Sequence, residues 1–270
     1  MTEQLESKQK KALSAGSIKL LIFACLMVIF LIYYAIMLMS APGRKLAEIK
    51  AKYGIQKVQG NNQDERLYTD SAYLSLLKEK AFLQSRISMA ETDSIYMTLD
   101  IPDSTVNLEI SGVTVHSAKI KEIKVSKILS SGNSYIISSM LSSPLNIKSD
   151  FATIKKEPLM IKMAPKDTSE FKPDIIPDTT DFEPVNYILE MDNGTRVFVY
   201  QDKDTITTHK NRLFYFDLND KLKSTWSSLK SVTRFKVPEY HPFIKIKLPK
   251  ADAKIFYRAI PRYGQIAIYM

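Results

Sequence analysis

The clearest pattern along the chain is one long apolar run near the N-terminus. The run from Leu20 to Met39 contains no charged residue. At 1.5 Å per residue it matches a hydrocarbon slab of roughly 30 Å. Helices in the core of soluble proteins seldom stay apolar on every face. The pattern predicts a transmembrane helix over residues 20–40.

The end of the run favours an uncleaved anchor. A cleaved signal peptide needs a short apolar region and small residues before the cut, whereas this run ends Met37-Leu38-Met39-Ser40-Ala41. Basic residues flank the run on both sides, so the positive-inside rule does not decide the orientation. A short basic head before a large C-terminal domain favours export. We predict a cytoplasmic head over residues 1–19 and a single-pass membrane protein with most of the chain extracytoplasmic, in the periplasm.

A helical stalk is predicted over residues 41–92. Leu46 and Ile49 recur at helical spacing directly after the span. A linker is expected over residues 60–64, and a second helix from Asp70 to about Met89, with Asp70 or Ser71 as its N-cap.

Beyond Asp93 the period changes to the alternation of β-strands. Residues 95–101 and 106–110 read as a hairpin that continues as a meander to Ile128. We predict an α+β, mostly β, domain over residues 93–270, in which an antiparallel meander or sandwich carries a few helices. Further strands are expected at 185–189, 196–200, 243–248 and 266–269, with a helix at 249–260.

Three segments have weaker patterns. Residues 212–218 are interpreted as a strand in which Phe214, Tyr215 and Phe216 belong to the core. A short helix is expected at 224–230, around the only tryptophan, Trp226. The proline-rich stretch over residues 158–184 predicts a long loop.

Composition limits the chemistry. The net charge is +9, and basic residues are concentrated between Arg234 and Arg262. This fits an anionic partner such as lipid headgroups or an acidic glycan, or simply a solvated face. Cys25 is the only cysteine and lies in the apolar run, so the following domain has no thiol for a disulfide, a nucleophile or a metal.

No catalytic constellation emerges from the remaining residues. His116, His209 and His241 are the only histidines, and no two have the spacing of metal ligands. The 8 glycines form no phosphate-binding loop. No aromatic motif of RNA-binding proteins is present. We therefore predict no cofactor, no metal site and no nucleic-acid partner.

The C-terminal segment resembles one family. The stretch from Ile246 to Tyr257 is similar to the residues that follow the catalytic cysteine of L,D-transpeptidases, which cross-link peptidoglycan stem peptides. Gly264 to Ile268 stands where that family has its next strand. The strands expected between Ile95 and Val125 resemble the opening meander of the family.

The chain departs from the family at the catalytic positions. The family's arginine falls on Lys247, and its upstream histidine falls near Tyr200. Aligned without gaps, the family's Ser-His-Gly-Cys falls on Pro242, Phe243, Ile244 and Lys245. A lysine in place of the catalytic cysteine would form an inert amide instead of a reactive thioester, so turnover is not expected.

The resemblance therefore implies a catalytically inactive, membrane-anchored binding or scaffold protein of the cell envelope. Strand alternation places Lys245 and Lys247 on one face, as a candidate surface for an anionic ligand such as peptidoglycan. An unrelated single-pass protein that assembles with envelope proteins through its span and stalk is the alternative. An active cell-wall transferase or hydrolase is the third hypothesis.

Overall fold

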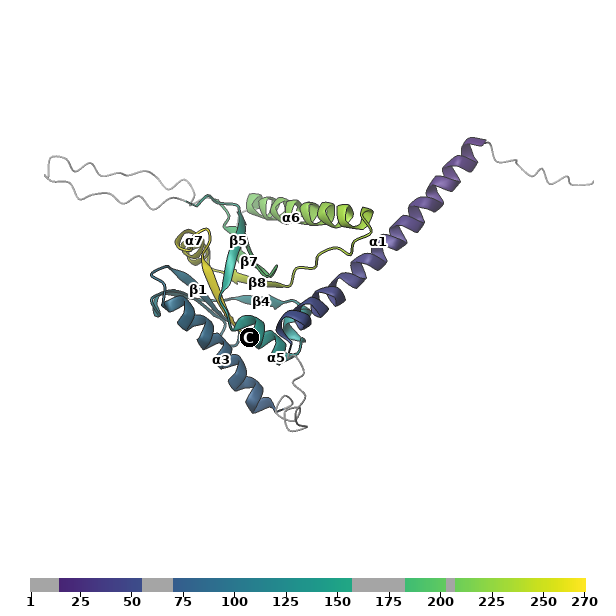
Figure 1. The fold of residues 1–270 in the computed structure, drawn as a ribbon. Helices are drawn as coiled ribbons and strands as arrows, with labels where there is room; N and C mark the ends of the chain where they lie inside the picture. Colours follow the sequence, from purple (N-terminus) through teal and green to yellow (C-terminus); the bar gives the residue numbers. More distant parts are fainter. Residues whose placement is uncertain (1–14, 55–69, 157–182, 203–206) are drawn as a thin grey trace, which may run out of the picture.

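The computed structural model describes residues 15–54, 70–156, 183–202 and 207–270 as an α+β fold around a mixed nine-stranded sheet (Figure 1). The predicted α+β class is confirmed. The helices are α1 (Ala15–Tyr53), α3 (Ser71–Ala90), α4 (Lys127–Ser130), α5 (Ser134–Leu141), α6 (Thr207–Thr233) and α7 (Lys250–Ala259). The strands are β1 (Tyr96–Asp100), β2 (Thr105–Ile110), β3 (Val113–Lys119), β4 (Glu122–Val125), β5 (Leu145–Ala152), β6 (Asn186–Met191), β7 (Arg196–Gln201), β8 (Phe243–Leu248) and β9 (Gln265–Tyr269).

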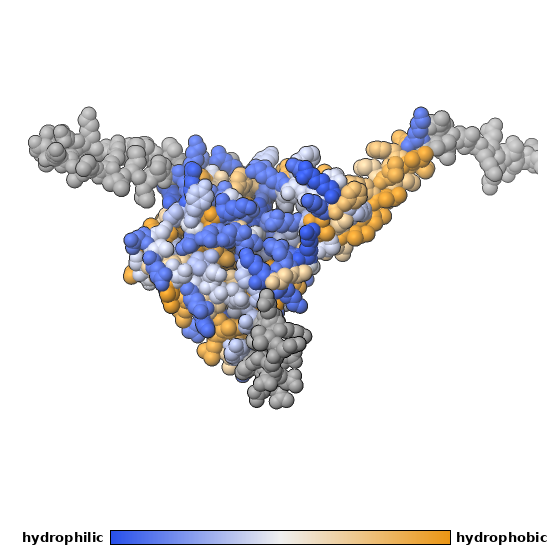
Figure 2. All heavy atoms as spheres, viewed as in Figure 1, coloured by the Kyte–Doolittle hydropathy of each residue, from blue (hydrophilic) through white to orange (hydrophobic). Residues whose placement is uncertain are grey.

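Helix α1 is long and apolar enough to cross a membrane, and it is unbroken from Ala15 to Tyr53. Its apolar half projects away from the domain into empty space (Figures 1 and 2). Its C-terminal half packs on the domain, where Ala41, Lys45 and Ile49 are all buried. These residues recur every fourth position and therefore lie on one helix face. The predicted span thus continues directly into a helix that is part of the domain.

The second predicted helix is confirmed as α3. The Asp70 side chain accepts a hydrogen bond from the Ala72 amide at 2.9 Å, which satisfies one of the free N–H groups of the first turn. The predicted linker at residues 60–64 lies outside the described residues.

The opening meander is confirmed for three strands. Strands β1, β2 and β3 pair antiparallel in sequence order. Gly112 turns β2 into β3 with a φ of +83°, which an L side chain rarely adopts. Beyond β3 the prediction of a continued meander is wrong, because β4 pairs with β8 at the opposite edge of the sheet.

The sheet has the order β3-β2-β1-β9-β5-β6-β7-β8-β4. Most neighbours are antiparallel, but β1 pairs parallel with β9 and β7 pairs parallel with β8. The C-terminal strand β9 therefore lies in the middle of the sheet and joins the meander to the remaining strands. The predicted C-terminal strand, helix and strand are confirmed as β8, α7 and β9.

The two faces of the sheet carry different helices. The main core holds the side chains of one face together with residues of α4, α5 and α7. Two smaller clusters lie on the other face. One packs Phe216 of α6 on β6 and β7, and the other packs Met89 of α3 on β1 and β9.

Helix α6 corrects two predictions. The strand expected at 212–218 and the short helix expected at 224–230 are parts of one helix, Thr207–Thr233. Of the aromatic triplet assigned to the core, only Phe216 is buried, whereas Phe214 and Tyr215 are exposed. Three consecutive aromatic residues favour a strand, but on a helix they point in three directions. The proline-rich loop lies mostly outside the described residues.

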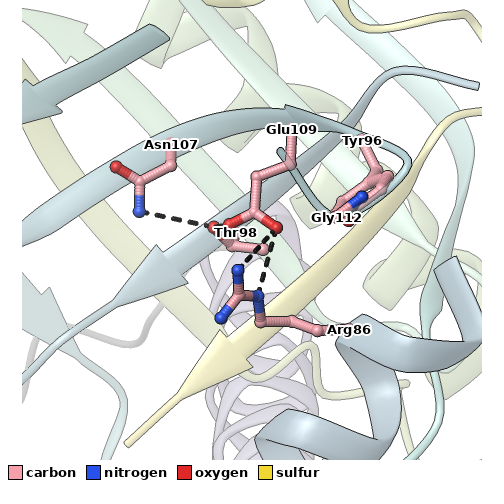
Figure 3. A network of polar contacts seen from close by, with 6 residues as sticks. All are labelled: Arg86, Tyr96, Thr98, Asn107, Glu109 and Gly112. Atoms are coloured by element: carbon pink, nitrogen blue, oxygen red, sulfur yellow. Dashed lines mark hydrogen bonds and ion pairs between the residues drawn. The ribbon is translucent and has the colours of Figure 1, made fainter. Parts of the chain in front are cut away.

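A buried polar network fixes α3 on the sheet (Figure 3). The Arg86 guanidinium donates from Nε and Nη2 to Glu109 Oε2 at 3.1 and 3.0 Å. Thr98 donates its hydroxyl to Glu109 Oε1 at 2.9 Å. The Glu109 side chain is only 2% exposed, so both of its oxygens are satisfied by protein groups. The network connects α3 with β1 and β2.

Candidate functional site

Strand β8 carries the positions that the family resemblance singled out. Its burial alternates: Ile244, Ile246 and Leu248 enter the main core, whereas Lys245 and Lys247 are half-buried on the opposite face. The predicted placement of both lysines on one face is confirmed. This is also the face that α6 covers, since the residues around Lys245 belong to the cluster containing Phe216.

Lys245 lies in an aromatic cage. Its Nζ is 4.5 Å from the ring centre of Phe198, 5.5 Å from that of Phe243 and 5.7 Å from that of Tyr200. Ring faces attract a cation electrostatically. Burial lowers the pKa of Lys245 below its usual range, and the nearby Asp217 of α6 partly opposes this shift. The charge of Lys245 is thus directed at groups of the protein itself.

The remaining positions of the degenerate motif hold no free cation. Lys247 forms an ion pair with Glu122 of β4, with Nζ 2.8 Å from Oε2. Pro242 and Ile244 are buried, and Phe243 contributes its ring to the Lys245 cage. An anion-binding role for Lys245 and Lys247 stays a prediction, and a ligand there has to compete with Glu122 and Asp217.

Two of the three histidines have partners within the fold. His116 Nε2 lies 3.0 Å from Asp252 Oδ1, which links β3 to α7. His241 Nδ1 lies 3.0 Å from the Gly194 carbonyl oxygen. The His209 side chain lies outside the described part. Among the described residues, no three His, Cys, Asp or Glu side chains are grouped as a metal site requires.

A basic cavity lies beside β5 and α7, away from the Lys245 cage. The cavity is open to solvent and has a volume of about 540 Å³. Its cationic lining comes from three separate parts of the chain, namely β5, the residues that follow β5 and the turn after α7. The basic cavity is lined chiefly by Lys148, Lys155, Lys156 and Arg262, together with Asp150 and Tyr257.

Lys156 is the cavity cation whose Nζ is buried. Its Nζ is buried 5.1 Å from the ring centre of Tyr257 and has no hydrogen-bond partner within the described ranges. Burial lowers the pKa of Lys156, the Asp150 carboxylate raises it, and Arg262 lowers it further. The Nζ itself has almost no solvent-accessible surface, so an anion in the cavity would compensate its charge from close by and would bond it directly only after the side chain turns outward.

Tyr257 and Asp150 are joined to each other in the lining of the cavity. The Tyr257 hydroxyl donates to Asp150 Oδ2 at 2.7 Å. Burial, reinforced by the Asp150 carboxylate, raises the pKa of Tyr257, so its proton stays in place at neutral pH. The cavity therefore places several cations around one carboxylate, Asp150, which is already hydrogen-bonded by Tyr257. This arrangement suits binding of a carboxylate or phosphate group.

The sequence alone indicated only part of the basic cavity. Arg262 belongs to the basic C-terminal stretch already noted, but Lys155 and Lys156 precede the proline-rich segment and form no motif. Strand β5 was not predicted, so nothing indicated that Asp150 and Tyr257 meet.

The comparisons with known proteins identify no family. No protein-family model, curated protein or solved structure matches the chain. The likeness to L,D-transpeptidases therefore stays a prediction.

Proposed function

We propose that the chain is a single-pass membrane protein whose domain acts outside the cytoplasm as a non-catalytic binding or scaffold subunit of the cell envelope. Its ligand is an anionic envelope component, with the carboxylates of peptidoglycan stem peptides as the first candidate. The L,D-transpeptidase-like segment belongs to this proposal as a degenerate relative of a peptidoglycan-binding fold.

The unbroken helix α1 is the observation that carries the proposal. Its apolar half is exposed along its length, which leaves a lipid bilayer as the environment that satisfies it. Its C-terminal half is part of the domain through the buried Ala41, Lys45 and Ile49. Since α1 continues as one helix through Pro42 between the two halves, the domain is held close to the membrane surface.

Orientation is tested with a topology reporter. Alkaline phosphatase is active only after export, and a fusion after Met270 should be active in cells. A fusion of cytoplasmic green fluorescent protein at the same site should be dark. A phosphatase fusion that is well expressed but inactive places the domain in the cytoplasm and excludes peptidoglycan as its ligand.

The basic cavity is the binding site that the proposal uses. It holds a buried lysine without a hydrogen-bond partner in the described part, whereas Lys247 is already paired with Glu122. The full-length protein in mild detergent should co-sediment with isolated sacculi at low salt. The double variant Lys156→Gln/Arg262→Gln should lose several-fold in binding, and added salt should shrink the difference because it screens charges over roughly 10 Å.

A matched control separates the site from the overall charge. Lys119→Gln/Lys121→Gln removes two exposed lysines at the connection between β3 and β4, and with them the same net charge. Exposed single charges contribute about 0–1 kcal/mol each, so this control should bind nearly as the parent protein does. Equal losses in both variants show non-specific attraction, and absence of co-sedimentation rules out peptidoglycan.

Assembly with another envelope protein is the second candidate, and helix α3 favours it. Leu76, Leu83 and Ile87 lie on one face of α3 and are 65%, 42% and 61% exposed. Apolar stripes of this kind are typical of protein interfaces. Leu83→Glu/Ile87→Glu should then abolish co-purification of a partner in mild detergent, while sacculus binding stays unchanged.

A further inference from the structure

Helix α6 has two opposite faces. One faces the sheet: Phe216 stacks on Phe151 of β5 with ring centres 4.9 Å apart. Asp217 accepts a hydrogen bond from the Tyr200 hydroxyl at 3.0 Å, and Asp220 pairs with Arg196 at 3.1 Å. These contacts fix the rotation of α6 about its own axis.

The other face of α6 is apolar and points away from the protein. At about 100° per residue, the stripe that recurs every fourth position from Phe214 lies roughly opposite Phe216 and Asp220. Soluble monomers rarely expose aromatic and leucine side chains over several helical turns. The stripe consists of Phe214 (63% exposed), Tyr215 (67%), Leu218 (37%), Leu222 (60%) and Trp226 (71%).

Cations flank this stripe. Arg212 and Lys230 lie along one border and Lys221 along the other, and all three are exposed. The two acidic residues in this part of α6, Asp217 and Asp220, lie on the sheet-facing side in the contacts described above. An apolar stripe bordered by basic residues is the pattern of a helix that lies in the plane of a membrane interface.

The position of α6 agrees with this pattern. Figure 1 shows α6 on the side of the domain from which α1 projects, with its C-terminal end close to α1. Phe235, just beyond α6, is 83% exposed and contacts Tyr33 of the apolar run with ring centres 6.2 Å apart. Arg234 and Lys236 are exposed on either side of Phe235. Tyrosine and basic side chains prefer the boundary between headgroups and acyl chains.

We propose that α6 is a second membrane contact, which inserts its apolar stripe into the headgroup–acyl boundary of the bilayer that α1 spans, with Arg212, Lys221 and Lys230 on anionic headgroups. This rests on the proposed membrane anchor. Two contacts fix the tilt and rotation of the domain on the membrane, which one helix alone does not. Figure 1 shows α3 at the end of the domain remote from α6, although both helices pack on the same face of the twisted sheet, so α3 then faces away from the bilayer.

The only tryptophan of the chain, Trp226, lies in this stripe and reports its environment directly. The full-length protein is reconstituted into vesicles of phosphatidylcholine and phosphatidylglycerol, with and without brominated acyl chains. Brominated lipid should quench Trp226 strongly, and aqueous acrylamide should quench it several-fold less than an exposed tryptophan. Phe214→Ser/Leu222→Ser should restore access to acrylamide.

The matched probe is Trp226→Phe/Ile87→Trp, which moves the tryptophan to the exposed face of α3. It should be quenched by acrylamide and hardly by brominated lipid. Equal quenching of the two probes overturns the proposal. Retention of the protein on vesicles after an alkaline wash tests the anchor separately. A retained protein with a solvent-exposed Trp226 refutes only the role of α6, whereas a protein released by the wash refutes both.

Discussion

Two neighbouring tyrosines in the core give opposite predictions at the level of single residues. The Tyr187 hydroxyl is fully buried and has no hydrogen-bond partner in the part of the chain described here, whereas the Tyr257 hydroxyl donates to Asp150. Their rings lie 4.9 Å apart, so the two sites share one environment. A buried polar group without a partner costs about 1–3 kcal/mol.

Tyr187→Phe should therefore raise the free energy of unfolding by about 1 kcal/mol, because it removes a buried hydroxyl that forms no bond. Tyr257→Phe should lower it by about 1–2 kcal/mol, because it leaves Asp150 without a donor. Urea unfolding in mild detergent, followed by circular dichroism, measures both. A loss of stability in Tyr187→Phe would show that its hydroxyl has a partner.

The same tyrosines predict a loss of stability at alkaline pH. Burial raises the pKa values of Tyr187, Tyr200 and Tyr257 above the ordinary value of 10.0. Above pH 10 the unfolded chain releases these protons while the folded protein retains them, so stability falls as pH rises. Lys156 and Lys245 contribute the opposite pH dependence. Burial lowers their pKa values, so between the lowered values and pH 10.5 the unfolded chain binds more protons and stability rises with pH.

A difference measurement removes the contribution of the lysines. The free energy of unfolding of the parent protein should fall more steeply above pH 10 than that of Tyr187→Phe. Parallel curves for the two proteins would mean that the Tyr187 phenol ionises equally well in the folded and unfolded states.

The buried network of Figure 3 predicts a strong effect of one arginine. Arg86→Met leaves the Glu109 carboxylate buried with only uncharged partners, the hydroxyls of Thr98 and Tyr96. Because Arg86 itself is 31% exposed, we expect a loss of about 2–4 kcal/mol, at or below the range of fully buried pairs. Thermal unfolding measures the loss, and Arg86→Met/Glu109→Leu should recover part of it. A double variant as unstable as the single one would show that packing, not the charge, is responsible.

At the level of elements, helix α3 can be tested at its first turn. Asp70→Ala removes the acceptor for the Ala72 amide and should cost about 1 kcal/mol of stability. Asp93→Ala, at an exposed position just after α3, serves as the control and should change stability little. Equal effects of the two variants would assign the loss to charge and not to the cap.

Elements with a strong local signal were predictable from the sequence. Helix α3 has a cap and an apolar stripe, and aliphatic residues recur at every second position along β1 and β2, so each element carries its own evidence. Helix α6 was not predictable in this way. Both of its faces are apolar, because one packs on the sheet and the other is exposed, and this obscures the helical period. Strand β4 was misplaced because pairing with β8 depends on contacts distant in sequence.

At the level of the whole molecule, the apolar helix α1 and the basic cavity differ in how far the sequence revealed them. A run without charges depends on composition alone, so α1 could be located directly. The cavity gathers Lys148, Lys156 and Arg262 from separate segments, and only the order of the sheet brings β5 beside β9. No pattern within a single segment predicts that these three residues line one cavity.

The domain and the apolar helix α1 form one continuous unit, and an intact mass tests most directly whether α1 stays attached as the proposed anchor. Membranes from cells that express the full chain are washed with alkaline carbonate, and the retained protein is extracted and weighed by mass spectrometry. We expect the retained species to have the mass of the uncleaved chain, 30.8 kDa, with α1 still attached. A soluble product that has lost the residues up to about Ala41 would show that the apolar run is a cleaved signal sequence, and would contradict both the anchor and the membrane contact of α6.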